Sequence, residues 1–244
     1  MNEQLYRTFY EIETKHWWFV ARQQIIKALL SRKLRLSKSS PVLDVGCGTG
    51  ALLEMFSEQY TAYGTDTSPL AIEFCRKRGL ANAILGTLDD LPNPELRYDL
   101  IAALDVIEHL EDDRGLLLQI NTLLKPDGAL ILTVPAYQWM WSSHDDLNHH
   151  KRRYTKPQLQ HLLASTGYSI DFISYYNTLL FPAAVATRLF ERASKQHSDA
   201  ALSMPGAFLN STLTSIFSFE RHLLRYSSLP FGLSIIALAH PAGR

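Results

Sequence analysis

The chain has 244 residues, 46% of them apolar, which is enough to bury a substantial core as one large domain. Its 24 Lys and Arg residues balance 24 Asp and Glu residues, which excludes a global field that would draw it to nucleic acid or to an anionic membrane. Two cysteines, Cys47 and Cys75, have neither a disulfide framework nor a metal-type spacing. Without a signal-peptide pattern or an apolar run of about 20 residues, the protein is expected in the cytoplasm.

The first segment, residues 1–35, contains two adjacent tryptophans in HWWFVAR at 16–22. Successive helix positions point about 100° apart, so both rings cannot lie centrally on one narrow apolar stripe. Two interpretations stay open: a wide apolar face packed on the domain, or a helical lid over a ligand.

Strands then alternate with helices, a pattern typical of a parallel sheet covered on both faces. Ser68 with Pro69 predicts the start of a helix that Gly79 ends, and LLKPDG at 123–128 predicts a helix end and a tight turn. The predicted strands are 41–45, 60–65, 82–85, 98–104, 128–134, 168–175 and 231–239.

The glycine-rich loop in VLDVGCGTG, residues 42–50, follows the first of these strands. Glycines allow a tight turn and close approach of a ligand to the backbone, and the next helix N-terminus offers free N–H groups. Gly46, Gly48 and Ala51 also satisfy the loose dinucleotide pattern, so a nicotinamide or flavin site is an alternative. Asp44 disfavours it, because a carboxylate repels a pyrophosphate but suits a cofactor carrying an ammonium and a sulfonium.

A second acid, Asp66, ends the next predicted strand about 20 residues after Gly46, where a carboxylate can accept both hydroxyls of a ribose. Together with LDDLP at 88–92 and LDVIEHLEDD at 104–113, these motifs make the chain resemble the class I S-adenosylmethionine-dependent methyltransferases over roughly residues 16 to 175. The resemblance implies S-adenosylmethionine as cofactor.

The resemblance also implies the fold, a Rossmann-like α/β domain with a doubly wound, seven-stranded, mostly parallel sheet. One domain over 1–244 is expected, with an N-terminal helical lid at 1–35, a cofactor-binding core at 36–175, a helical insertion at 176–230, and a final strand and tail at 231–244.

Cofactor contacts are carried over residue by residue. The glycine loop would bind the methionyl part of S-adenosylmethionine, and the acid that ends the second strand would bind the ribose. The segment after the third strand would contact the adenine. Thr87 stands where many relatives have an acid, and Asp89 could substitute for it. The expected cofactor-binding residues are Asp44, Gly46, Cys47, Gly48, Asp66, Thr67, Thr87, Leu88, Asp105 and Arg22, the last reaching the cofactor carboxylate or an acceptor anion.

Asp105, Glu108 and His109 form a cluster in DVIEHL, at the predicted end of the fourth strand. These side chains could bind a divalent metal, or they could order the loop around them. Because no further ligand follows at a fixed spacing, no metal site is predicted.

The segment after the fifth strand, residues 134–159, holds the other two tryptophans, Trp139 and Trp141. Both tryptophan pairs could close as an aromatic roof over cofactor and acceptor. The candidate catalytic residues lie here: His144 and His150 as proton acceptors, with Tyr154.

The basic run Lys151 to Arg153 lies beside two acids, so it predicts a solvated loop with one anion-binding arginine rather than an RNA site. Two motifs in this chain, HxxRYT at 150–155 and HWWF.AR at 16–22, resemble those of a bacterial methyltransferase subgroup that is often associated with cell-envelope or lipid-linked glycan chemistry.

Two helical stretches in the insertion, 179–193 and 206–225, carry apolar residues such as Phe217 and Leu224 at helical spacing. They either pack on the core or a second subunit, as in a homodimer, or cap a lipid-like acceptor at a membrane surface. Methyl transfer to a small-molecule or lipid-linked acceptor, without nucleic acid, is the expected function. A nicotinamide-dependent oxidoreductase and a non-catalytic cofactor-binding protein are the alternatives.

Overall fold

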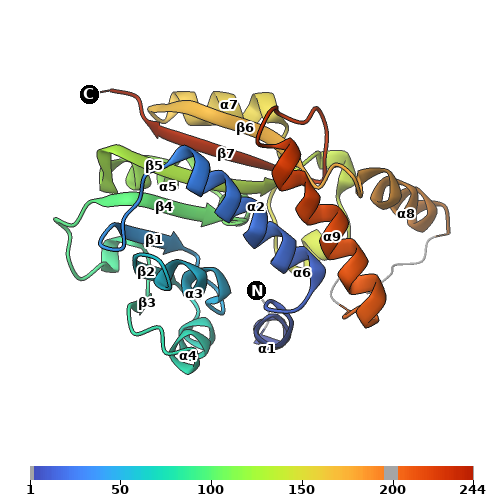
Figure 1. Ribbon diagram of the computed structural model, residues 1–244, viewed down its shortest axis with the longest axis horizontal. Coiled ribbons are helices and arrows are strands. Elements are labelled where there is room, and N and C mark those ends of the chain that lie inside the picture. Colours follow the sequence, from blue (N-terminus) through green and yellow to red (C-terminus); the bar gives the residue numbers. More distant parts are fainter. Residues whose placement is uncertain (1–2, 195–202, 244) are drawn as a thin grey trace.

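The computed structural model describes residues 3–194 and 203–243, which form one seven-stranded sheet with helices on both faces (Figure 1). The strand order is β3-β2-β1-β4-β5-β7-β6, and within the described residues only β7 runs antiparallel to its neighbours. This arrangement confirms the predicted Rossmann-like α/β fold. The strands are β1 (Pro41–Val45), β2 (Thr61–Asp66), β3 (Ala83–Leu85), β4 (Tyr98–Leu104), β5 (Leu124–Pro135), β6 (Tyr168–Tyr176) and β7 (Ser234–Pro241).

Both faces of the sheet are buried because alternate residues of the central strands enter different apolar clusters. Val42 and Leu100 belong to one cluster, and their chain neighbours Leu43 and Ile101 belong to the other. The first face is covered by α2 (Trp17–Lys33), α3 (Ala51–Ser57), α4 (Pro69–Lys77) and α9 (Ala207–Leu223), and the second by α5 (Asp113–Leu123) and α7 (Lys156–Ser165).

Local signals placed α4 correctly. The Ser68 hydroxyl accepts a hydrogen bond from the Ala71 N–H, and Pro69 occupies the first helical position. Gly79, at φ +79°, follows the helix.

The helix end predicted within 123–128 is confirmed, and the backbone folds back at 125–128, where a Cβ on Gly128 would lie 3.0 Å from the Lys125 nitrogen. α5 ends at Leu123, and β5 begins at once with Leu124, which pairs with Tyr98. The register then shifts, so that pairing continues at Ala129. Gly128 makes this irregularity feasible, because a Cβ there would lie 2.6 Å from the Tyr98 carbonyl oxygen.

The first two helices connect different parts of the domain. α1 (Glu3–Ile12) packs on α4 through Tyr6, which contacts Ala71 and Phe74. α2 lies along α9, and the Trp17 ring packs edge-on against Phe217 at a centroid distance of 6.0 Å (Figure 1). The N-terminal segment and the insertion therefore pack against each other, although they are far apart in the sequence.

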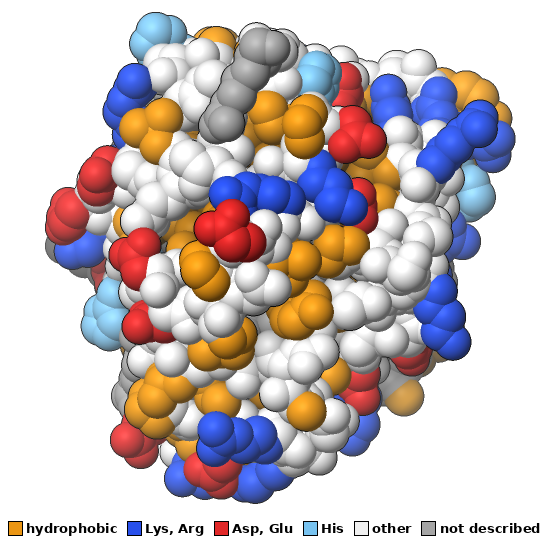
Figure 2. Space-filling model, turned by 90° about the vertical axis from the view of Figure 1, so that its left-hand side faces the viewer, with side chains coloured by type: hydrophobic (Ala, Val, Ile, Leu, Met, Phe, Trp, Pro, Cys, Tyr) orange, Lys and Arg blue, Asp and Glu red, His pale blue; other side chains and the backbone are white. Residues whose placement is uncertain are grey.

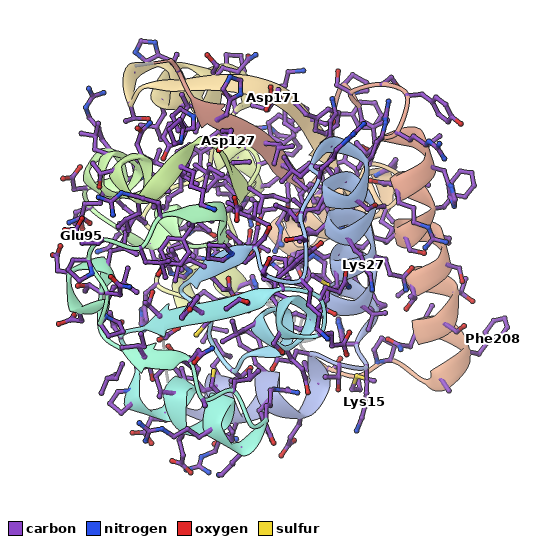
Figure 3. The ribbon with its side chains drawn as sticks, turned by 60° about the vertical axis from the view of Figure 1, so that its left-hand side comes forward. Lys15, Lys27, Glu95, Asp127, Asp171 and Phe208 are labelled. Atoms are coloured by element: carbon purple, nitrogen blue, oxygen red, sulfur yellow. The ribbon has the colours of Figure 1, made fainter. Side chains whose placement is uncertain are left out.

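The apolar stripe of α9 is mostly structural. Phe217 and Leu224 are both buried in the core, as expected if the insertion packs on the domain. The other face of α9 carries exposed apolar side chains, and Phe208 projects away from the body of the molecule (Figure 3). α8 (Phe181–Ser194) also exposes Leu189 and Phe190.

Acidic and basic side chains are interspersed on the face shown in Figure 2, in keeping with the zero formal net charge. Among the described helices, none combines the length and apolar character needed to cross a membrane.

Candidate functional site

A cavity of about 400 Å³ lies at the carboxyl ends of β1, β4 and β5, where open α/β sheets bind ligands. Its walls come from the loops after these strands, from α1 and α2, and from α8 and the start of β7. Eight of the predicted site residues line this cavity: Arg22, Asp44, Gly46, Cys47, Gly48, Asp105, His144 and His150.

Gly46 and Gly48 of the glycine loop present backbone without side chains at one end of the cavity. Gly46 has φ +68°, and a Cβ there would lie 2.8 Å from a methyl carbon of Val106. Beside the loop, Asp44 is 2% exposed, and its Oδ2 has no hydrogen-bond partner in the described structure. Burial raises the pKa of Asp44 to about 8, against the opposing charge of Arg22. An orphaned carboxylate oxygen next to the exposed backbone of two glycines fits the ammonium end of S-adenosylmethionine.

Arg22 projects from α2 into the same end of the cavity. Its Nη1 pairs with Asp105 Oδ2, and its guanidinium carbon lies 4.3 Å from the Trp18 ring centroid. The Arg22 Nε is buried and has no hydrogen-bond partner in the described structure, so it remains able to donate to a ligand oxygen. Asp105 has φ +57°, an uncommon conformation for a residue other than glycine, and its Oδ1 accepts from the Thr133 hydroxyl at 3.1 Å.

A hydrogen-bond network that sequence reasoning missed ties α1 to the glycine loop. Glu13 accepts from the Thr49 hydroxyl and pairs with Arg78 at 2.8 Å. Arg78 also donates to the Thr49 carbonyl at 2.8 Å and pairs with Glu54 at 2.9 Å. No local pattern in the sequence predicts these contacts, because they join segments up to 65 residues apart. The placement of α1 and α2 supports a covering role, and lid movement remains a prediction.

The residues expected to hold ribose and adenine lie outside the cavity lining. Both Asp66 oxygens accept backbone bonds of 2.9 Å, one from Gly48 and one from Ser68. Thr67 follows β2 and is exposed, and Thr87 caps the short 3-10 helix η1 (Leu88–Asp90), in which Leu88 is buried. These residues follow β2 and β3 at the carboxyl edge of the sheet, and their cofactor contacts remain predictions.

The other end of the cavity is built around Asp145, which sequence reasoning had treated only as part of a charged loop. This fully buried residue lies in α6 (Ser143–Leu147) and accepts from His150 Nδ1 at 2.8 Å. It also accepts two bonds of 2.8 Å from Arg153. Burial alone would raise the pKa of Asp145, but the bonds from His150 and Arg153 hold it well below its usual range. The charge of Arg153 is therefore paired within the protein, and which arginine of the basic run binds an anion stays a prediction.

These contacts define the two histidines expected as proton acceptors. Because a carboxylate can only accept, His150 Nδ1–H donates a hydrogen bond to Asp145, so the lone pair of an unprotonated ring lies on Nε2. In contrast, His144 Nε2 accepts a 3.2 Å bond from the Asn148 amide. Burial lowers the pKa of His144 as well. Of the two, His150 is the better placed proton acceptor.

Glu108 and His109 lie beside His150, on the 3-10 helix η2 (Ile107–His109) that follows β4. The ring centroids of His109 and His150 are 4.7 Å apart, and one ligand atom from each of the three residues lies within 4.8 Å of the others. Burial raises the pKa of Glu108 well above its usual value, and burial lowers the pKa of His109 to about 4. The fold thus supplies the additional metal-type ligand that no fixed spacing in the sequence had indicated.

Two expectations for the segment after β5 are wrong. The Tyr154 hydroxyl donates to Asp113 at 2.7 Å, and Tyr154 does not line the cavity, so it has a structural role. Burial and the adjacent carboxylate raise the pKa of Tyr154. Trp139 and Trp141 are also absent from the lining, whereas Met140 between them faces the cavity. Trp139 lies on the short 3-10 helix η3 (Gln138–Met140) and is exposed, and the Trp141 indole donates to Asp146 at 2.9 Å, so the four tryptophans do not form one roof over this cavity.

A family model described as a methyltransferase domain matches residues 18–171. The chain is 30% identical over 101 residues to a mitochondrial ubiquinone biosynthesis O-methyltransferase of Schizosaccharomyces pombe, covering 38% of this chain and 36% of that protein. It is 25% identical over 169 residues to a Mycolicibacterium smegmatis protein named as an S-adenosylmethionine-dependent methyltransferase, covering 68% of this chain and 64% of that one. The chain thus spans less than two thirds of the length of either relative.

Among solved structures, the plantazolicin methyltransferase in complex with a triazolic desmethylPZN analogue and SAH superposes with a TM-score of 0.62. The superposition covers 99% of this chain and 91% of that one at 15% identity. At this identity, the likeness shows a shared fold.

Proposed function

Because the chain belongs to the methyltransferase domain family and is an S-adenosylmethionine-dependent methyltransferase, we propose that it methylates an oxygen atom of a small-molecule acceptor held beside His150. The observation that carries this proposal is a single cavity that joins the glycine loop and Asp44 at one end to His150 and its buried partner Asp145 at the other. The relatives named as O-methyltransferases support oxygen as the acceptor atom. Family membership favours this reading over a nicotinamide-dependent oxidoreductase.

S-adenosylmethionine supplies a methyl group already activated on a sulfonium, so the protein has to align the acceptor and exclude water. Asp44 and Arg22 line the same cavity, and in this proposal they bind the two charged groups of the methionyl part. Asp145 holds the His150 ring with Nε2 free to accept the proton of an acceptor hydroxyl. Trp18 lies over Arg22 and closes part of the cavity from solvent.

The test is to combine the purified protein with S-adenosylmethionine and a panel of small phenols, alcohols and amines, and to measure S-adenosylhomocysteine formation. We expect turnover with hydroxyl acceptors, and His150→Gln should lower kcat by roughly 100-fold or more, the usual worth of a proton-transfer group. His161→Gln is the matched control, because His161 is an exposed histidine on α7. Calorimetry should show binding of S-adenosylhomocysteine and no binding of NAD. Turnover with amines alone would contradict an oxygen acceptor.

The exposed apolar surface of α8 and α9 favours an acceptor with an apolar tail that leaves the cavity beside α8. Ala184 and Arg188 of α8 line the cavity, while Phe190 on the same helix is 68% exposed. Phe208, at the start of α9, is 88% exposed. Exposed aromatic side chains of this kind on two helices are suited to rest on a lipid surface, where such an acceptor would lie.

Sedimentation with anionic and neutral liposomes tests the apolar surface. Phe208→Ser should reduce liposome binding and turnover of a tailed acceptor, with unchanged affinity for S-adenosylhomocysteine. Leu118→Ser is the matched control, because Leu118 is an exposed apolar residue on α5, on the opposite face of the sheet. If Phe208→Ser instead changes the mass measured by light scattering, the surface is a homodimer contact and the lipid assignment is wrong.

A further inference from the structure

An arginine of α8 faces the acceptor end of the cavity. Arg188 lines the cavity together with Ala184, one turn earlier on the same helix. Burial lowers the pKa of His144, and the charge of Arg188 lowers it further, so the two side chains are close enough to interact. Arg188 therefore lies at the end of the cavity built around Asp145, opposite the glycine loop that is expected to bind the cofactor.

The orientation of α8 is the reverse of the one that core packing favours. Leu189 and Phe190 are exposed, whereas the Arg188 side chain faces the cavity and is only 24% exposed. An amphipathic helix normally buries its apolar residues and leaves its charged residues in water, because burial of a charge is costly. An arginine on the cavity side of α8 is therefore better explained by a ligand than by packing.

The Arg188 guanidinium is only partly satisfied by the protein. Its Nη1 donates to Glu191 Oε2 at 2.7 Å, across one turn of the helix. Its Nε is buried and has no hydrogen-bond partner in the described structure. A guanidinium presents five N–H donors in a rigid, planar fork, so the ion pair with Glu191 can orient this fork without using the Nε–H. An oxygen atom of a bound ligand would satisfy that donor.

The N-terminal end of α8 is anchored to the core. The Glu220 carboxylate accepts hydrogen bonds of 2.6–2.8 Å from the backbone N–H groups of residues 177–179, just before the helix. Phe181, the first residue of α8, packs against Phe231 at a ring-centroid distance of 5.5 Å and against Tyr137 at 5.8 Å. Arg188, about two turns further along, is therefore presented to the cavity by a helix whose start is fixed.

The other charged side chains near this end are engaged within the protein or are shifted towards their neutral form. Arg153 is bonded to Asp145, and burial raises the pKa of Glu108 well above its usual value, which favours the neutral carboxyl group. Arg22, which also has an unpartnered Nε in the described structure, lies beside the glycine loop. At the acceptor end of the described lining, Arg188 is thus the arginine with a donor left for an anion.

We propose that Arg188 binds an anionic group of the acceptor, a carboxylate or a phosphate, through its Nε–H. This inference rests on the proposed function and deepens it: the acceptor hydroxyl lies beside His150, and the anionic group lies beside α8. A charge-assisted hydrogen bond to a fixed guanidinium would hold the acceptor in one orientation, with its hydroxyl oxygen towards the methyl group. The acceptor class is then a hydroxylated acid or phosphate rather than a neutral alcohol.

The test is calorimetric titration of the protein loaded with S-adenosylhomocysteine. The probes are para-hydroxyphenylacetate, para-hydroxybenzylphosphonate and the uncharged para-hydroxyphenylacetamide, which share a phenol ring. We expect at least one of the two anions to bind about tenfold or more tightly than the amide, and the tighter of the two identifies a carboxylate or a phosphate. Arg188→Gln should abolish this preference, and Arg188→Lys should retain part of it because the charge remains.

Two further variants serve as controls. Arg76→Gln, which removes an exposed arginine of α4 outside the cavity lining, should leave every affinity unchanged. Glu191→Gln weakens the ion pair but leaves the Nε–H of Arg188 in place, so the preference for an anion should persist. An equal loss of preference in Glu191→Gln and Arg188→Gln would assign Arg188 to the ion pair and overturn the proposal.

The remaining outcomes separate this inference from the proposed function. Equal affinity for the anions and the amide, or a preference that survives Arg188→Gln, overturns the anion site. A loss of S-adenosylhomocysteine affinity in Arg188→Gln would assign the arginine to the cofactor and would also overturn it. Methylation of the amide as fast as of the anions would reject the anion site alone, whereas methylation of amines and of no hydroxyl probe would reject the proposed function.

Discussion

Replacing Asp66 by asparagine tests whether this acid binds the cofactor ribose. Asp66 ends β2 and is 9% exposed, and its carboxylate accepts bonds of 2.9 Å from the Gly48 and Ser68 backbones. Burial raises its pKa, while both backbone bonds lower it, so the residue is positioned by donors that favour its charged form. Asparagine keeps the size and one acceptor oxygen, but it lacks the charge.

The expected loss follows from the bonds that asparagine cannot replace. A hydrogen bond to a charged group is worth about 1.5–3 kcal/mol, so the affinity for S-adenosylhomocysteine should fall by roughly 10- to 150-fold. The bond to one of the two backbone N–H groups is also weakened, which should reduce the free energy of unfolding by about 0.5–1.5 kcal/mol. The loss of affinity should therefore exceed the loss of stability.

Isothermal titration with S-adenosylhomocysteine measures the affinity, and urea unfolding measures the stability. Asp127→Asn is the control, because Asp127 is exposed in the irregular part of β5, remote from the cavity (Figure 3). An Asp66→Asn protein whose affinity stays within twofold of the unmodified chain would refute the ribose assignment. A parallel fall of affinity in Asp127→Asn would show that the method reports general destabilisation.

Three further predictions follow from the cavity and the insertion. When Trp139 and Trp141 are replaced by phenylalanine, the remaining tryptophan fluorescence comes from the pair on α2. This emission should shift to the blue and resist acrylamide quenching when S-adenosylhomocysteine binds. Unchanged emission at a saturating concentration of ligand would exclude lid closure. Asp44 has a folded-state pKa raised to about 8, so its contribution to stability is greatest below its unfolded-state pKa near 4 and is lost as pH rises through 8. In urea unfolding of the ligand-free proteins, the free energy of unfolding of Asp44→Asn should therefore rise relative to that of the unmodified protein as pH increases between these two pKa values, by up to about 1.4 kcal/mol per pH unit. A difference that does not depend on pH would contradict the raised pKa. The Glu220 carboxylate accepts hydrogen bonds of 2.6–2.8 Å from the backbone N–H groups of residues 177–179. Glu220→Gln should therefore lower the free energy of unfolding by about 2–4 kcal/mol. A loss below about 0.5 kcal/mol would show that water replaces these bonds.

The sequence by itself determined the succession of strands and helices along the chain and brought the glycine loop and its neighbouring acids to one edge of the sheet. Asp44 and Gly46 end one parallel strand, and Asp105 ends another. Because parallel strands joined by covering helices place their carboxyl ends at one edge, local periodicity is sufficient to bring these residues together. Local chemistry was likewise sufficient for the start of α4 at Ser68.

Only the tertiary structure decided how the acceptor end is built. The pairing of Arg22 with Asp105 spans 83 residues, and the approach of Glu108 to His150 depends on how the loop after β5 packs on η2. The outward turn of Trp139 and the bond from Tyr154 to Asp113 depend on that same packing. Such contacts carry no periodic signal in the chain, because they arise from side chains that become neighbours only when separate elements pack together. The sequence could therefore name the histidines of this region, but packing determined which of them faces the cavity with a free lone pair.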